Sequence, residues 1–168
     1  DQIYGGRIYR LLKVGAQHRY NGDSLGIGSR ILEQISGRPL PQLYQRCLFG
    51  PLGMKHTTAT NSSYDARTTA LDLARFGQML ANRGAYGDKR YFTERTFKQM
   101  IPQRLEKLLG DDTVMEWGIG LTWFGDQVIG HGSATACTLQ VDLKNDTVVT
   151  MTRGAAGRNF GEYHDRFI

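Results

Sequence analysis

The chain has 168 residues, of which 40% are hydrophobic and 22% are charged, and these values are typical of a globular domain with its own core. Its 21 Lys and Arg residues exceed its 16 Asp and Glu residues, which gives a net charge of +5. Because the charges are scattered along the chain, we expect a solvated surface and no nucleic-acid partner. We recognise no transmembrane segment and no signal peptide in the sequence.

The cysteines and histidines do not form a metal-binding pattern. Cys47 and Cys137 are far apart and have no ligand spacing. The histidines also lack the spacing of a ligand pair; they are His18, His56, His131 and His164. We therefore expect neither a metal nor a cofactor.

The first part of the chain is predicted to be helical. Leu25, Ile31, Leu32 and Ile35 form one stripe of a helix over residues 24–36, which Gly37 ends. In this interpretation Asp23 and Ser24 form the N-cap of the helix.

Three further helices are predicted over residues 40–48, 69–82 and 93–101. Pro39 begins the first of them, and a turn follows at residues 51–54. Thr69 and Asp72 have the spacing of a capping box at the start of the second helix, and Thr93 is a cap for the third. Residues 104–115 are charged and contain glycine, which predicts a loop.

From Glu116 onward the hydrophobic period changes from helical spacing to two. The segments GIGLTWF, QVIGHG, TACTLQVD and TVVTMTRG are typical of strands, with turn signals at 125–126 and 144–146. We expect an antiparallel sheet of at least three strands between residues 117 and 153, with the His131 strand in its middle. Residues 159–168 are predicted to form a terminal helix, and helices followed by strands indicate the α+β class.

Five segments carry a resemblance to a known family. They are HRYNGDSLGIGSRILEQISGRPL, LFGPLGM, TALDLARFGQMLANRG, EWGIGLTWF and GHGSATACTLQVDLKNDTVV. Their order and spacing over residues 18–149 resemble the C-terminal part of the serine β-lactamase and penicillin-binding-protein superfamily, especially its class C, esterase and amide-hydrolase branches. The resemblance implies a β-lactamase/transpeptidase-like fold. It also implies one incomplete domain, with a mainly helical part over 1–116 and strands with a terminal helix over 117–168.

The resemblance also implies the residues of an active site. In the family, Ser-x-x-Lys supplies the nucleophile, Tyr-x-Asn a base, and a Lys/His-x-Gly strand lines the pocket. Tyr20 then corresponds to the base, His131 to the strand residue, and the Ala134 N–H to an oxyanion donor. The residues expected to contact substrate are Asn21, Gly22, Gly132 and Ser133.

The chain departs from the family motifs at two of these positions. Gly22 replaces the motif asparagine, so the side-chain amide contact is missing unless Asn21 provides it. Ser133 replaces the final glycine and makes the strand bulkier beside the substrate. We expect the glycines around His131 to let a substrate approach the strand edge.

The nucleophile motif is missing from the 168 residues, because no lysine has Ser or Thr three positions before it. We expect a C-terminal portion of a serine hydrolase, inactive alone, whose upstream segment completes the fold. Its substrate would be a small molecule or a peptide containing an ester, amide or β-lactam, and the family is commonly exported. The alternative is a degenerate, non-catalytic module that binds a peptide or a cell-wall-like ligand.

Without the resemblance, the same residues have ordinary structural interpretations. Tyr20 is then a half-buried aromatic residue at a helix entry, and His131 a turn or strand histidine. Trp117 and Trp123 are predicted to be core or pocket-wall aromatics. Arg153, at the end of the last strand, could contact a substrate carboxylate, but a solvated arginine at the sheet edge is favoured.

Overall fold

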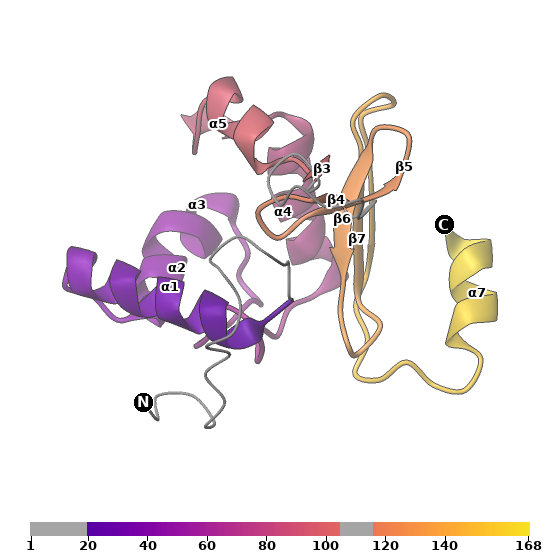
Figure 1. Cartoon of the computed structure of the whole chain (residues 1–168), viewed down its shortest axis with the longest axis horizontal. Helices are drawn as coiled ribbons and strands as arrows, with labels where there is room; N and C mark the ends of the chain where they lie inside the picture. Colours follow the sequence, from indigo (N-terminus) through magenta and orange to yellow (C-terminus); the bar gives the residue numbers. More distant parts are fainter. Residues whose placement is uncertain (1–19, 105–115) are drawn as a thin grey trace, which may run out of the picture.

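A computed structural model of the chain describes residues 20–104 and 116–168. Most of the loop predicted over residues 104–115 lies outside the described residues, as do residues 1–19. The helices of the first half lie on one side of the molecule and an antiparallel sheet on the other (Figure 1).

The first helix, α1, covers Gly22–Ser36 and starts earlier than predicted. Its N-cap is Asn21, whose side-chain oxygen accepts a hydrogen bond from the Asp23 N–H at 2.7 Å. The assignment of the cap to Asp23 and Ser24 was therefore wrong, because both residues already belong to the first turn. Gly37 ends the helix as predicted, in the left-handed region with φ of 63°.

The second helical run is longer and less regular than predicted. It consists of α2 (Leu40–Tyr44), a π-helical turn η1 (Gln45–Phe49) and α3 (Gly50–Leu52). The widened turn ends at Phe49, two residues before Pro51, which has no N–H to continue the helical hydrogen bonds. The predicted turn at 51–54 therefore begins only at Gly53, where φ is 68°.

Helices α4 (Ala70–Ala81) and α5 (Glu94–Met100) confirm two predictions and their caps. The hydroxyl oxygens of Thr69 and Thr93 each accept a backbone N–H at 3.2 Å. Asp72 does not complete a capping box. Its buried carboxylate instead accepts hydrogen bonds from the His56 N–H at 2.7 Å and the Thr57 hydroxyl at 3.0 Å.

Two small strand pairs were not predicted. One is the hairpin of β1 (Ala85–Tyr86) with β2 (Lys89–Arg90). The other pairs β3 (Gln103–Arg104) with β4 (Glu116–Trp117), segments that lie far apart in the sequence. Strands of two residues are too short to show a period, so the sequence pattern could not reveal them.

The main sheet confirms the predicted antiparallel meander. Its strands are β5 (Thr122–Gly125), β6 (Val128–Gly132), β7 (Thr138–Asp142) and β8 (Thr147–Met151), in that spatial order. Turns join β5 to β6 and β7 to β8 at the predicted positions, so the strand that carries His131 is an inner strand.

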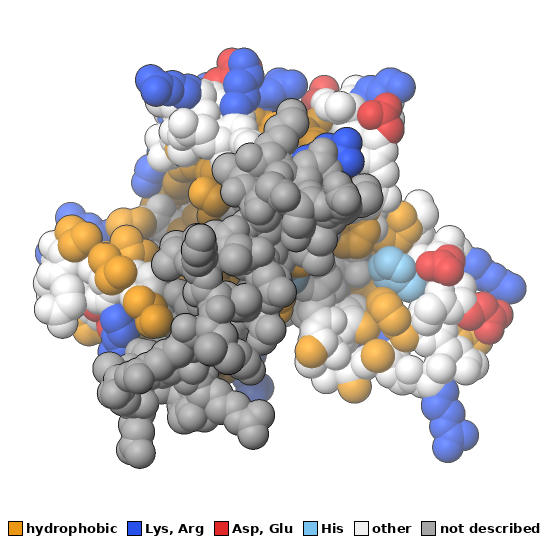
Figure 2. All heavy atoms as spheres, in the orientation of Figure 1, with side chains coloured by type: hydrophobic (Ala, Val, Ile, Leu, Met, Phe, Trp, Pro, Cys, Tyr) orange, Lys and Arg blue, Asp and Glu red, His pale blue; other side chains and the backbone are white. Residues whose placement is uncertain are grey.

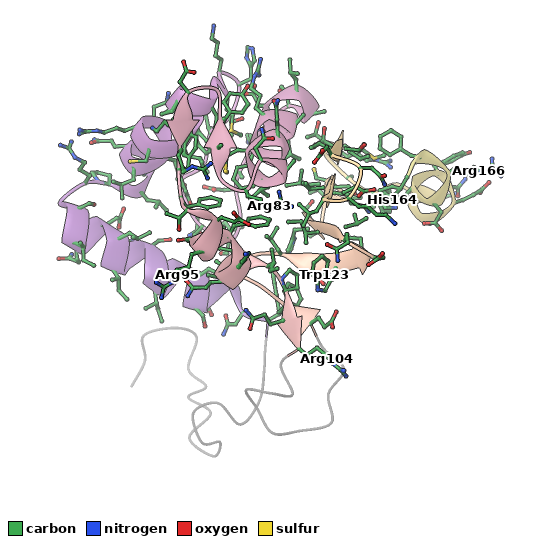
Figure 3. All side chains as sticks on the ribbon, turned by 90° about the horizontal axis from the view of Figure 1, so that it is seen from above. Arg83, Arg95, Arg104, Trp123, His164 and Arg166 are labelled. Atoms are coloured by element: carbon green, nitrogen blue, oxygen red, sulfur yellow. The ribbon has the colours of Figure 1, made fainter. Side chains whose placement is uncertain are left out.

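The terminal helix α7 (Phe160–Phe167) was also predicted, and it lies beside the sheet at the end of a connecting segment (Figure 1). The His164 ring nitrogen Nε2 is 2.9 Å from the Thr138 hydroxyl of β7. In Figure 3 His164 lies on the sheet side of α7, whereas Arg166 points outward. The Arg153 guanidinium, predicted to be solvated, lies 5.1 Å from the centre of the Phe160 ring.

The hydrophobic core lies between α4 and the sheet. Gly77 permits this close packing, because a Cβ atom there would lie 2.4 Å from the Val148 side chain of β8. Met79, Leu80, Ile129 and Val141 are almost completely buried.

By contrast, the apolar stripe of α1 is exposed, with exposed fractions from 45% at Leu25 to 79% at Ile35. Figure 2 shows hydrophobic side chains at this end of the molecule. Among the described helices, none is sufficiently long and apolar to span a membrane.

Candidate active site

A cavity of about 1020 Å³ lies where the start of α1 meets the end of β6. We call it the cleft. Its wall is formed by Tyr20, Asn21, Ser24, Leu25, Ser62, Ser63, Trp117, Gly118, Gly120, Thr122, His131, Gly132, Ser133 and Ala134. The structure thus brings six of the seven predicted site residues to one cavity, and leaves Gly22 out of its wall.

Three aromatic rings form one side of the cleft. The Tyr20 ring centre lies 5.5 Å from that of Trp117 and 6.2 Å from that of His131, and the last two are 5.9 Å apart. Tyr20 is 62% exposed, so its ring remains open to a ligand. Trp117, predicted only as a core or pocket-wall aromatic, is a pocket-wall residue.

His131 lies where the pairing of β6 changes. Strand β5 pairs with β6 only as far as Gly130, whereas β7 continues along β6 through His131 and Gly132. Among the described strands, none pairs with the edge of β6 that faces away from β7 at these two residues, and both line the cleft. The Nδ1 atom of His131 contacts the Gly132 carbonyl oxygen, and this leaves Nε2 as the other ring nitrogen that a ligand can use.

The two glycines beside His131 have different roles. A Cβ atom at Gly130 would lie 1.9 Å from the Leu139 carbonyl oxygen, so β7 approaches too closely for any side chain. At Gly132 the nearest atom would be 3.8 Å away. The expectation that both glycines serve substrate approach was therefore wrong for Gly130, which serves strand packing.

The loop after β6 is held by Ser133. Its hydroxyl oxygen accepts the Cys137 N–H at 3.0 Å and lies 3.0 Å from the Thr135 hydroxyl. Its own N–H donates to the Cys137 carbonyl at 3.0 Å. Among the residues that the structure describes, the N–H of the next residue, Ala134, has no protein acceptor, and Ala134 lines the cleft.

Cys137, at the end of this loop, has a thiol whose pKa is lowered from its ordinary value. Burial raises the pKa, but hydrogen bonds from Thr135, the Arg153 backbone and Ser133, together with the Arg153 charge, outweigh it. The thiol does not line the cleft.

Asn21 lines the cleft, whereas Gly22 lies against a neighbouring loop. The Asn21 side-chain oxygen is used by the cap of α1, which leaves its NH₂ group as a donor on the cleft wall. Gly22 faces the loop that carries Ser63, because a Cβ atom at Gly22 would lie 3.0 Å from the Ser63 hydroxyl oxygen. Ser62 and Ser63 were missed by the sequence analysis, since they belong to an irregular loop that has no period or motif.

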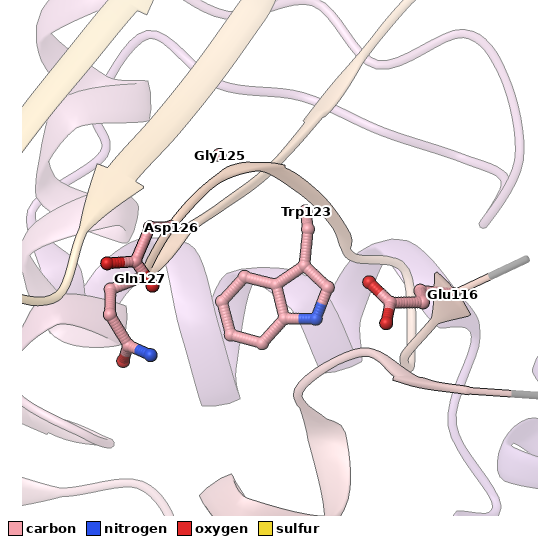
Figure 4. Close-up of a pocket in the computed structure, with 5 residues that line it drawn as sticks. All are labelled: Glu116, Trp123, Gly125, Asp126 and Gln127. Atoms are coloured by element: carbon pink, nitrogen blue, oxygen red, sulfur yellow. The ribbon is translucent and has the colours of Figure 1, made fainter. Parts of the chain in front are cut away.

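The cleft wall carries no Asp, Glu, Lys or Arg side chain among the residues that the structure describes. Over residues 20–104 and 116–168, no three His, Cys, Asp or Glu side chains are grouped as metal ligands. A second, smaller hollow of about 380 Å³ lies against Trp123 and the β5–β6 turn (Figure 4). It contains none of the predicted site residues.

A family model described as Beta-lactamase matches residues 10–166. The chain belongs to the β-lactamase family. The search of curated proteins finds no match to it. The predicted fold class is confirmed by the match and by the solved structures that resemble the chain.

Three solved structures resemble the chain at low sequence identity. Proteins named as β-lactamases from Bacteroides dorei and Mycobacterium bovis have TM-scores of 0.70 and 0.74, each at 18% identity, and cover 91% and 89% of this chain. A protein named as a 6-aminohexanoate-dimer hydrolase from Bacillus anthracis has a TM-score of 0.77 at 20% identity and covers 91% of this chain. This chain spans 59%, 61% and 43% of their respective lengths.

Proposed function

We propose that the cleft is the acyl-transfer site of a serine hydrolase that acts on an ester, amide or β-lactam. The observation that carries the proposal is the contact between Tyr20 and His131, residues from two distant motifs, beside the end of β6. The family supports serine-hydrolase chemistry.

In this mechanism Tyr20 is the general base. Its phenolate accepts the proton of a serine hydroxyl, and the serine oxygen forms a bond to the substrate carbonyl carbon. The bond between the carbonyl carbon and the leaving oxygen or nitrogen then breaks, and the proton passes to that atom. A water molecule later attacks the acyl-enzyme, whose ester bond to the serine oxygen breaks, and the serine regains a proton. Tyrosine ordinarily has a pKa of about 10, so a nearby cation is needed to stabilise the phenolate. Since the described cleft wall has no Lys or Arg, that cation would come from other residues. The nucleophilic serine would come with it, because the 168 residues contain no Ser-x-x-Lys.

The end of β6 would stabilise the negative charge that develops on the carbonyl oxygen. The Ala134 N–H is free to donate to this oxygen together with the N–H of the nucleophile, and one such donor contributes about 2.7–4 kcal/mol. Because the Nδ1–H of His131 donates to the Gly132 carbonyl, the neutral ring would present Nε2 to the substrate as an acceptor, and the Asn21 NH₂ group would contact a carbonyl of the substrate. Gly132 leaves room for the substrate, and Ser133 fixes the loop that presents Ala134.

We further propose that the 168 residues alone do not turn over substrate, because they contain no Ser-x-x-Lys. An upstream segment of the same protein would supply this motif and complete the fold, and the partner of the whole would be a small-molecule or peptide substrate. The same missing motif favours one alternative, a non-catalytic module that binds a peptide or a cell-wall-like ligand in the cleft.

Active-site labelling of the full-length protein tests the proposal. A fluorophosphonate probe should label it, and Tyr20→Phe should reduce ester turnover by about 10²–10⁴-fold, the usual contribution of a positioned base. Tyr163→Phe is the matched control, because Tyr163 is an exposed residue of α7 outside the cleft. Full activity of Tyr20→Phe would refute the role of Tyr20, and a full-length protein that the probe does not label would favour the binding module.

A further inference from the structure

The hollow beside the β5–β6 turn combines an indole ring with three polar side chains. Its volume is about 380 Å³, and its wall is formed by Glu116, Trp123, Gly125, Asp126 and Gln127. Figure 4 shows the indole between the Glu116 carboxylate and the side chains of Asp126 and Gln127. None of these residues lines the cleft, so the two cavities have separate walls.

The sheet and its turn bring these side chains together. The pairing of β5 with β6 shifts its register between Trp123 and Gly125, as it does at a β-bulge, where the strand bends and a side chain is redirected. The turn that follows contains Gln127 in the left-handed region, with φ of 61°. The Gln127 carbonyl accepts the Leu143 N–H at 2.9 Å, which fixes the turn to the chain after β7. Strand β4 supplies Glu116.

The hollow is acidic, although the chain has a net charge of +5. Its wall carries the carboxylates of Glu116 and Asp126 and no Lys or Arg among the residues that the structure describes. No described residue forms a hydrogen bond or an ion pair with the side chains of Glu116, Asp126 or Gln127. Arg104, which pairs with Glu116 across β3 and β4, does not line the hollow. Two carboxylates without a basic partner on one concave surface attract a cation.

Trp123 determines which kind of cation fits. It packs against the hydrophobic core and also lines the hollow, and an indole attracts cations more strongly than the other aromatic rings do. An ammonium group with N–H bonds is strongly hydrated, and at an open site it keeps much of its water. A methylated ammonium group is weakly hydrated, so its methyl groups make van der Waals contact with the ring. Among the described residues, the two carboxylates belong to no group of three metal ligands.

We propose that this hollow binds a quaternary ammonium group, with the cation in contact with the Trp123 indole and its charge balanced by Glu116 and Asp126. The side-chain oxygen of Gln127 accepts a hydrogen bond from a hydroxyl group of the ligand. The volume of the hollow is at the lower end of the range of about 300–1,000 Å³ for ligand pockets, which suits a head group of the size of choline. The inference does not depend on the proposed acyl-transfer function, because the hollow shares no wall residue with the cleft.

The test compares two compounds of nearly equal shape, choline and 3,3-dimethylbutan-1-ol, in which a carbon atom replaces the charged nitrogen. Binding to the full-length protein is followed by the NMR signal of the Trp123 indole N–H at low ionic strength. Contact of a cation with an indole at an exposed site corresponds to about two- to fivefold in affinity, and each carboxylate adds to it. Choline should therefore bind at least about fivefold more tightly than the alcohol. Added NaCl should weaken the binding of choline and leave that of the alcohol unchanged.

Removal of the carboxylates provides a second measurement. The double variant Glu116→Gln/Asp126→Asn should reduce the preference for choline by at least about twofold and leave the affinity for the alcohol unchanged. Asp88→Asn/Asp146→Asn is the matched control, because it removes the same charge from two exposed turn residues outside the hollow. This control should keep the full preference.

Four outcomes would overturn the inference. They are equal affinities in the parent protein, an undiminished preference in Glu116→Gln/Asp126→Asn, an equal loss in the control variant, and a shift of the Trp123 signal by N-acetylglucosamine but not by choline. The last would show that the hollow takes a neutral polyol. If the double variant binds neither compound, the salt titration of the parent protein decides, and an affinity for choline that is independent of NaCl overturns the role of the carboxylates.

Discussion

Helices α1 and α4 have similar sequence patterns and very different surroundings. Both begin with a side-chain N-cap and both carry an apolar stripe. Helix α4 lies against the sheet and buries Met79 and Leu80, whereas the only buried residue of α1 is Ser29. An amphipathic pattern therefore specifies a helix and its apolar face, but it does not specify which element covers that face.

Core truncations should show the largest difference between the two helices. Leu80→Ala removes a side chain that is 1% exposed, and such changes reduce the free energy of unfolding by about 2–5 kcal/mol. Leu32→Ala on α1, where Leu32 is 55% exposed, should cost no more than about 0.5 kcal/mol. Urea unfolding measures both. A comparable loss in Leu32→Ala would show that the stripe of α1 is covered in solution.

The buried carboxylate of α4 should make stability depend on pH. Burial raises the pKa of Asp72, but hydrogen bonds from His56 and Thr57 and the charge of Arg75 outweigh it and hold the pKa below its ordinary value. The stabilisation is therefore present above the unfolded-state pKa of about 3.9 and is lost as the pH falls through the lower folded-state value. Asp72→Asn should reduce the free energy of unfolding by about 1.5–3 kcal/mol at pH 7.

Measurement of the free energy of unfolding at acid pH is the control for the Asp72→Asn variant. As the pH falls below 4 and then through the lower folded-state pKa of Asp72, the stabilities of Asp72→Asn and the parent should converge, because the parent carboxylate then becomes protonated in the folded state as well. Asp23→Asn changes an acidic residue at the matching end of α1, where a charge near the helix terminus contributes about 0.3–1 kcal/mol. A gap for Asp72→Asn that persists undiminished into acid would contradict the role of the charge.

Loss of a helix cap should give the smallest loss of stability. The loss should be global for α4 and local for α1. Thr69→Ala and Asn21→Ala each remove the acceptor of one backbone N–H, a change that typically costs about 1 kcal/mol. Because α4 is part of the core, Thr69→Ala should lower global stability. Asn21→Ala should instead increase amide hydrogen exchange within the first turns of α1. Equal global losses would show that the two helices unfold as one unit.

The cleft residues that the sequence could predict are those that lie in short sequence motifs. Tyr20, His131 and Ala134 lie in motifs whose residue types and order are visible along the chain, and the cleft wall contains all three. Their catalytic roles stay predictions. Ser63 and the contact of Gly22 with it could not be predicted, because they depend on how an irregular loop returns to the start of α1.

The sequence by itself determined the helices that have caps and stop signals, the change to strand period at Glu116, the turns between strands and the family. The helices, the strand period and the turns depend on residues within a few positions of one another, whereas the family depends on the order of five segments over residues 18–149. Only the tertiary structure decided that Asp72 holds the loop at His56 instead of closing a capping box, that Gly130 serves the packing of β7, and that the stripe of α1 faces outward. Each of these depends on a contact between segments distant in the chain, and the local pattern of polar and apolar residues does not encode which segments meet.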